Sequence, residues 1–254
     1  MINGTGFSKK PLFYTLFLAF ILWIILFEFI IPENRFLPKP GIVLLSVHAL
    51  FADYNLAPDL FTTVSAVYLP SLLAYLFLLI IRRYIFSQNG FFNRLIEIIS
   101  QLSVFFPAVL LGILLIFWFP YTFITEYIFS FLVSVCWYLI VINKTKMISN
   151  KNYLVSFKSL GADDIFISKN IRWNEIKPLI LSNLDDFHIH LWSLILIFEF
   201  ISNRSGLGSI LRQTILFHDL SALCLVIFVI AAVISAGYLF LRYIENKFVF
   251  WSPE

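Results

Sequence analysis

The sequence predicts an all-α, polytopic membrane protein with six transmembrane helices and a single domain over residues 1–254. Apolar residues make up 60% of the chain and charged residues only 13%, with a mean hydropathy of +0.90. This balance lies far outside that of a soluble domain. The apolar residues also gather in runs of about 20, the length that crosses the hydrocarbon core of a bilayer as a helix. Because no long Pro-, Gly- or Ser-rich linker interrupts the sequence, we expect no second domain.

Six apolar runs mark the expected spans, near residues 12–31, 60–81, 98–119, 121–142, 179–201 and 220–241. The first follows Lys9 and Lys10 as a signal peptide would, but it is longer than a signal-peptide core and ends without a small-residue cleavage site. We therefore expect it to be retained as the first helix. The last follows His218-Asp219, and Asp219 is expected to accept hydrogen bonds from the first free amides of that helix.

The fifth run is the least uniform, because its first half carries Asp185, Asp186, His188 and His190. A helix surrounded by lipid does not tolerate these residues, so we expect this one to face protein or water. Carboxylates and imidazoles are also ligands for Zn²⁺ or Fe. However, His188 and His190 lie about 200° apart around a helix and cannot share one metal. Local pairs (Asp186 with His190, Asp185 with His188) or the wall of a hydrated cavity are the favoured interpretation, and a metal site is the alternative.

Basic residues predict the orientation. With a cytoplasmic N-terminus, segments 1–11, 82–97, 143–178 and 242–254 all lie inside. Fourteen basic residues then fall inside, namely Lys9, Lys10, Arg82, Arg83, Arg94, Lys144, Lys146, Lys151, Lys158, Lys169, Arg172, Lys177, Arg242 and Lys247. Four fall outside, namely Arg35, Lys39, Arg204 and Arg212. This bias predicts a multi-pass protein with both termini in the cytoplasm. The small excess of basic charge follows from these loops, so we expect membrane lipid and no nucleic acid around the chain.

The cytoplasmic loop 143–178 is centred on Leu160-Gly161-Ala162-Asp163. We expect two short helices joined at Gly161, because glycine accepts the left-handed conformation that ends a helix and Asp163 or Asp164 can cap the next one. Phe157, Leu160 and Ile165 would then form an apolar knob. The alternative is an amphipathic segment lying on the lipid headgroups.

Two segments, 155–178 and 199–208, resemble the permease subunits of bacterial ABC importers of the sulfonate, nitrate and taurine type. Val155 to Gly161 occupies the place of the family's Glu-Ala-Ala, three residues, Gly signature, and only the glycine and its Leu-Gly-Ala setting match well. The signature's ending is replaced by Ile171-Arg172-Trp173-Asn174, although Pro178 stands where many members carry a second proline. The second segment matches better, with Glu199 before the turn Ser205-Gly206-Leu207-Gly208.

The resemblance implies an importer permease (type I ABC importer) fold in the bacterial cytoplasmic (inner) membrane. It implies a permease homodimer that receives a small solute, such as a sulfonate, nitrate or taurine, from an extracytoplasmic solute-binding protein. ATP and Mg²⁺ would be bound by a separate ABC ATPase subunit. The implied site residues are those of the ATPase coupling loop (Phe157, Leu160, Gly161, Ala162, Asp163, Ile165 and Pro178), the translocation path (Trp192 and Glu199) and the outer turn (Ser205, Gly206 and Gly208). An anion path would require a partner for Glu199, and Arg204 or Arg212 is available.

Two other functions stay open. One is an intramembrane metal-dependent enzyme or metal-handling protein that uses Asp185, Asp186, His188 and His190. The other is a relative of the permeases that has lost ATPase coupling, because its loop signature is incomplete. The sequence contains no Gly-rich phosphate loop ending in Lys-Ser or Lys-Thr and no His-Glu-x-x-His. We therefore expect no catalytic, cofactor-binding or metal-binding residue in this chain.

Overall fold

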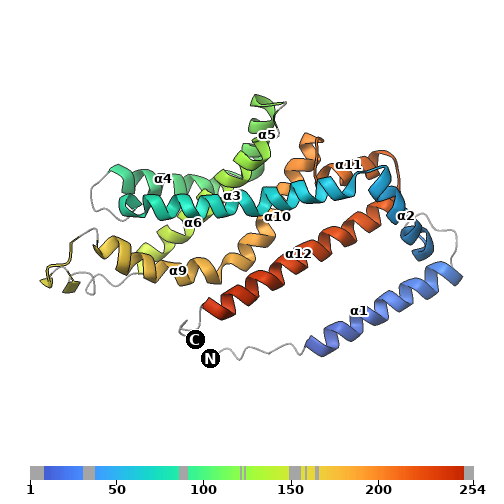
Figure 1. The fold of residues 1–254 in the computed structure, drawn as a ribbon, viewed down its shortest axis with the longest axis horizontal. Helices are drawn as coiled ribbons and strands as arrows, with labels where there is room; N and C mark the ends of the chain where they lie inside the picture. The colour runs from blue at the N-terminus through green and yellow to red at the C-terminus, as the bar shows by residue number, and fades with distance from the viewer. Residues whose placement is uncertain are drawn as a thin grey trace.

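The structure is a computed structural model that describes residues 9–30, 38–85, 91–120, 122, 124–148, 156–157, 159–163 and 166–248. The named elements in these ranges are all helices. They are α1 (Lys9–Ile24), the π-helical η1 (Ile25–Ile30), α2 (Pro40–Ala52), α3 (Leu56–Ile85), α4 (Phe91–Phe105), α5 (Ala108–Trp118), α6 (Ile124–Ile148), the π-helical η2 (Ile167–Arg172), α9 (Trp173–Ser182), α10 (Leu184–Ser202), α11 (Leu207–Leu216) and α12 (Leu220–Phe248). The predicted all-helical class is confirmed (Figure 1).

Three of the described helices, α3, α6 and α12, are long and apolar enough to cross a membrane. Two bent pairs, α4 with α5 and α10 with α11, raise the number to five if each pair is one span. The first predicted span corresponds to α1 and η1, whose part Ile21–Ile30 is one of the shorter apolar helices. The count of six transmembrane helices therefore stays a prediction.

The predicted span near 98–119 is not a single helix in the structure, which divides it between α4 and α5. The chain bends by 96° between α4 and α5, and Figure 1 shows α5 turning away from the line of α4. Pro107 lies at this break in an extended conformation, with φ −60° and ψ 124°. Proline lacks the amide that a helix needs and disfavours helical geometry in the residue before it. The bend is therefore encoded locally.

The predicted boundary at residue 178 between loop and fifth helix is also wrong. Helix α9 spans Trp173–Ser182 with Pro178 inside it, and α10 begins only after Asn183. Trp173, Ile176 and Ile180 recur at helical spacing and are buried, in a cluster with residues of α3, α4 and α6. This apolar face stabilises a helix where the charged composition suggested a loop.

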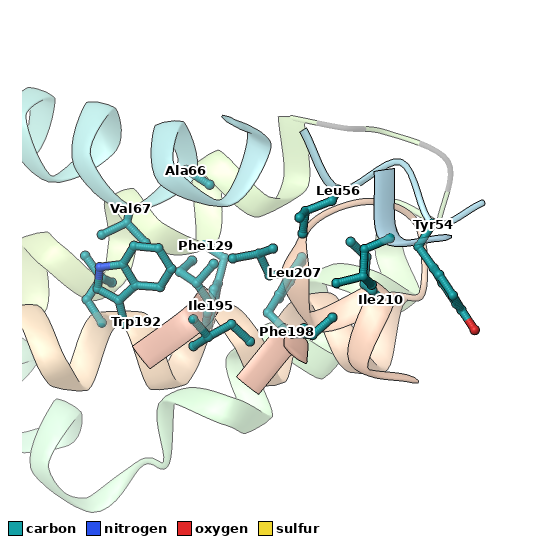
Figure 2. Packing of buried hydrophobic residues seen from close by; sticks show 14 of the residues in the cluster. Tyr54, Leu56, Ala66, Val67, Phe129, Trp192, Ile195, Phe198, Leu207 and Ile210 are labelled. Carbon is teal, nitrogen blue, oxygen red and sulfur yellow. The ribbon is translucent and has the colours of Figure 1, made fainter. Parts of the chain in front are cut away.

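The larger of the two apolar clusters that the described residues form surrounds α10. Trp192 is fully buried in this cluster together with Val67 of α3, and Phe198 and Leu207 continue the cluster toward α11 (Figure 2). Phe129 and Phe198 stack with ring centroids 4.9 Å apart, and Gly112 of α5 lies against both rings, where a Cβ atom would come 3.1 Å from Phe198. Small residues allow such close helix packing in membranes, where lipid is as apolar as the core.

Candidate functional site

Helix α10 has one buried and one exposed face. The buried residues recur with the helical period and are Phe187, His188, Leu191, Trp192, Ile195, Phe198 and Glu199. On the opposite face Asp186, His190, Ser193, Ile197 and Phe200 are exposed in line, three or four residues apart. The two residues that the sequence assigned to a translocation path, Trp192 and Glu199, are thus fully buried inside this chain.

The Glu199 carboxyl group is completely enclosed near the end of α10. Thr63 Oγ1 of α3 lies 2.7 Å from Glu199 Oε1, and the Gly208 amide of α11 donates to Glu199 Oε2 at 2.7 Å. Each oxygen therefore has a hydrogen-bond donor. A buried carboxyl group is costly unless it is paired in this way.

Three consecutive amides at the start of α11 donate to side chains of neighbouring helices. The Gly206 amide donates to the Asp59 carboxyl group, the Leu207 amide to Thr63 Oγ1 at 2.8 Å, and the Gly208 amide to Glu199 Oε2. The first amides of a helix have no partner within the helix and carry its positive dipole end. Helices α3 and α10 therefore supply acceptors that hold α11 in place.

The glycines of the outer turn are required by the close approach of this turn to Glu199. Gly206 has φ +93°, and a Cβ atom there would overlap the Glu199 carboxyl group. A Cβ atom on Gly208 would overlap the Leu196 carbonyl oxygen and come 2.7 Å from Glu199 Cβ. The sequence motif Ser205-Gly206-Leu207-Gly208 therefore has a steric explanation in this structure.

Sequence reasoning missed Glu126, a second carboxyl group at this site. It lies in the first turn of α6, is only 7% exposed, and its carboxyl group contacts that of Glu199. Its Oε1 has no hydrogen-bond partner among the described residues. An acidic residue in a first helical turn is explained by the helix dipole, so the sequence carries no signal that Glu126 faces Glu199.

The two arginines expected as partners of Glu199 bind elsewhere. Arg204 donates to the carbonyl oxygens of Thr122, at 2.9 Å, and Phe119. Arg212 donates to the carbonyl oxygens of Phe200 and Ile201 at 3.2 and 3.1 Å. Both guanidinium groups thus bind carbonyl groups at or just after the ends of α5 and α10, where the helix leaves them free.

The histidine and aspartate residues of α10 have different surroundings: His188 packs against other helices, and the two aspartates line a cavity. His188 Nε2 lies 3.1 Å from the Ile234 carbonyl oxygen of α12, its ring stacks on Tyr68, and its interaction with Asp185 is electrostatic. Asp185 and Asp186 instead line a cavity of about 620 Å³ between α10 and α12. Among the described residues, no group of three or more His, Cys, Asp or Glu side chains could hold a metal ion. Local pairs and a cavity wall therefore both stay predictions for this cluster.

The segment around Gly161 has the predicted helix-ending geometry. Gly161 has φ +84°, and the Ala162 amide donates to the Phe157 carbonyl oxygen at 3.1 Å, as in a Schellman motif. The Leu160 side chain is 81% exposed. The Asp163 carbonyl oxygen accepts a bond from the Ile167 amide at 3.0 Å, whereas Asp164 and Ile165 lie outside the described residues.

A comparison with protein families decides the class of this chain. The family model "binding-protein-dependent transport system inner membrane component" matches residues 78–249, well over half of the sequence. The chain belongs to this family. It is therefore a multi-pass inner-membrane transport component that works with an ABC ATPase and a binding protein, and it is not an enzyme. Searches among curated proteins and among solved structures gave no significant match.

The family match includes some parts of the permease site and leaves others outside it. Glu126, Glu199, Gly206 and Gly208 lie within the matched residues, as does the Gly161 segment. Thr63, which joins Glu199 to α11, comes from the part of α3 before the match. The site of this permease thus depends on a side chain that its family match does not reach.

Proposed function

We propose that the chain is the transmembrane subunit of an ATP-driven ABC importer of the sulfonate, nitrate and taurine type, acting as a homodimer with both termini in the cytoplasm. The observation that carries the proposal is the exposed face of α10, within the matched residues. This helix is one of the most deeply packed elements of the chain, yet it leaves one continuous face uncovered.

The exposed face of α10 supports a path at a dimer centre. It is polar at one end, with Asp186, His190 and Ser193, and apolar at the other, with Ile197 and Phe200. Ionisable residues within a spanning segment normally face protein or a water-filled space. We therefore propose that this face, and not the buried side chains of Trp192 and Glu199, lines the path between two copies. Among the proposed solutes, taurine carries an ammonium group that a carboxylate such as Asp186 can bind.

The Gly161 segment is the proposed contact with the ATPase. Leu160 presents a large apolar side chain to solvent, on a turn fixed by Gly161 and the Ala162 amide. A fixed turn is suited to transmitting the motion of a partner. Because the Leu160 side chain is exposed, its replacement should affect binding and leave the fold intact.

Co-purification with ATPase subunits from the same genome tests the proposal. We expect the native tagged chain to retain an ATPase in detergent, and Leu160→Asp and Gly161→Pro to lose it. Leu216→Asp is the matched control, because Leu216 is also exposed, at 62%, and lies in α11, which the predicted topology puts on the other side of the membrane.

Three other outcomes would count against parts of the proposal. Retention by both Leu160→Asp and Gly161→Pro would exclude this segment as the ATPase contact. Loss in the control as well would indicate a general effect of the added charge. Failure of the native chain to retain any ATPase, where a known importer stays assembled, would favour a permease relative that has lost coupling.

A further inference from the structure

We infer that Glu126 and Glu199 form a buried proton-binding site, in which a protonated Glu126 donates a hydrogen bond to an ionised Glu199. The site lies where α6 meets α10, next to the first turn of α11. A proton there would join these helices at one point.

The hydrogen-bond donors around Glu199 indicate that it is the acceptor of the bond between the two carboxyl groups. Gly208 supplies an amide to Oε2, and an amide can only donate. Thr63 accepts from the Leu207 amide, which leaves its own hydrogen for Glu199 Oε1 at 2.7 Å, a shorter contact than its 3.1 Å to the Asp59 carbonyl oxygen. With a donor on each oxygen, Glu199 is satisfied as a carboxylate.

The contact between the two carboxyl groups then requires a donor on Glu126. Two ionised carboxylates in contact repel each other, whereas a protonated carboxyl group donates to an ionised one. The other charged groups nearby do not remove this repulsion. Asp59 of α3 adds negative charge beside Glu126, and Arg204 and Arg212 bind the carbonyl groups of Thr122, Phe119, Phe200 and Ile201.

A proton suits this site better than a metal ion. A hard metal ion takes about six oxygen ligands or more, and the described residues offer no group of three metal-ligating side chains. Glu126 is only 7% exposed, and its Oε1 has no hydrogen-bond partner among the residues that the structure describes. A proton needs no cavity and supplies the missing interaction between the two carboxyl groups.

The proton would have a mechanical consequence. Thr63 links α3 to Glu199, and Gly208 links α11 to the same carboxyl group. The proton on Glu126 would connect α6 to this same carboxyl group. Its loss would place two negative charges in contact within an enclosed site, so α6 would separate from α10 at the bend between α10 and α11.

Infrared spectroscopy and thermal unfolding of the purified full chain test the inference without any transport assay. We expect the native chain at neutral pH to show the C=O stretch of a protonated carboxylic acid. Glu126→Gln should lose this band and keep near-native thermal stability, because its side-chain amide still donates to Glu199. Glu199→Gln should be less stable, because its NH₂ group would face the Gly208 amide or the Thr63 hydroxyl.

Asp59→Asn is the control, since Asp59 is the other carboxyl group at the site, and its band should equal that of the native chain. The inference is overturned if the native chain lacks the band, or if the band survives Glu126→Gln. If Asp59→Asn is the only variant that loses the band, the proton is assigned to Asp59 and not to Glu126. Stabilisation by added Na⁺ that Glu126→Gln abolishes would identify a metal cation in place of the proton. If Glu199→Gln does not fold, the presence or absence of the carboxylic acid band in Glu126→Gln still tests the inference.

Discussion

The Gly208 amide donates to Glu199 Oε2 at 2.7 Å, so α11 begins against a carboxyl group of the helix that precedes it. Together with the bonds from Gly206 and Leu207 to α3, this contact holds the 51° bend between α10 and α11. The turn is therefore a joint between three helices. A helix C-cap alone would leave the start of α11 without these acceptors.

Alanine at either turn glycine should destabilise the permease. Gly208→Ala places a Cβ atom against the Leu196 carbonyl oxygen, and Gly206→Ala places one in the Glu199 carboxyl group. Overpacking of this kind costs about 1–3 kcal/mol, and Gly206 adds the strain of its positive φ. The measurement is the free energy of unfolding in detergent by denaturant titration.

Gly161→Ala is the control for the turn glycines. Gly161 also has a positive φ, but nothing lies within 4 Å of its Cβ position, so only strain of about 1 kcal/mol is expected. Equal losses in Gly161→Ala and Gly206→Ala would show that strain alone acts and that Glu199 does not require a glycine at position 206.

Removal of the Thr63 hydroxyl should weaken the joint. Thr63→Val keeps the side-chain shape, but it leaves the buried Leu207 amide and Glu199 Oε1 without a partner. An unsatisfied buried polar group costs about 1–3 kcal/mol. Thr62→Val is the matched control, because the Thr62 hydroxyl donates to the Pro58 carbonyl oxygen four residues back in α3, in an exposed hydrogen bond. Comparable unfolding free energies for the two variants would contradict the bridging role.

The contact of α12 with α10 should depend on Gly237. A Cβ atom there would overlap the Tyr68 hydroxyl and come 2.7 Å from His188 Cε1, so Gly237→Ala should lower the melting temperature. Tyr68→Phe removes one of the two obstacles and should restore part of the loss in the double variant. A double variant no more stable than the additive sum would show that the hydroxyl is not the obstacle.

Disulfide cross-linking in membranes should report the proposed homodimer. Ser193→Cys lies on the exposed face of α10, and Ile80→Cys, 77% exposed on α3, is the control. Both are placed in a chain whose free Cys136 and Cys224 are replaced by alanine. We expect a dimer band on oxidation for Ser193→Cys only. A stronger band for Ile80→Cys would assign the dimer contact to α3 and contradict the proposed path.

Much of the fold follows from local patterns. Composition and run length predict an all-helical membrane protein, and Gly161 and Asp219 behave as their residue types predict. Asp219 Oδ1 accepts from the Ala222 amide at 3.0 Å as an N-cap. The break at Pro107 is also local, but an apolar run continuing across it conceals the bend. The extent of α9 depends on burial of Trp173, Ile176 and Ile180 against other helices, so the charged sequence of this region did not indicate it.

The membrane class and the distinctive Glu199 and glycine turn could be predicted from the sequence, because composition, helical period and glycine geometry act over a few neighbouring residues. The roles of those residues come from the three-dimensional packing. It turned Trp192 and Glu199 inward and sent Arg204 and Arg212 to carbonyl groups. It also placed Glu126 and Thr63, from other helices, against one carboxyl group. Local patterns cannot show this, because the orientation of a helix about its axis, and therefore the partner of each polar side chain, depends on how all the helices pack together.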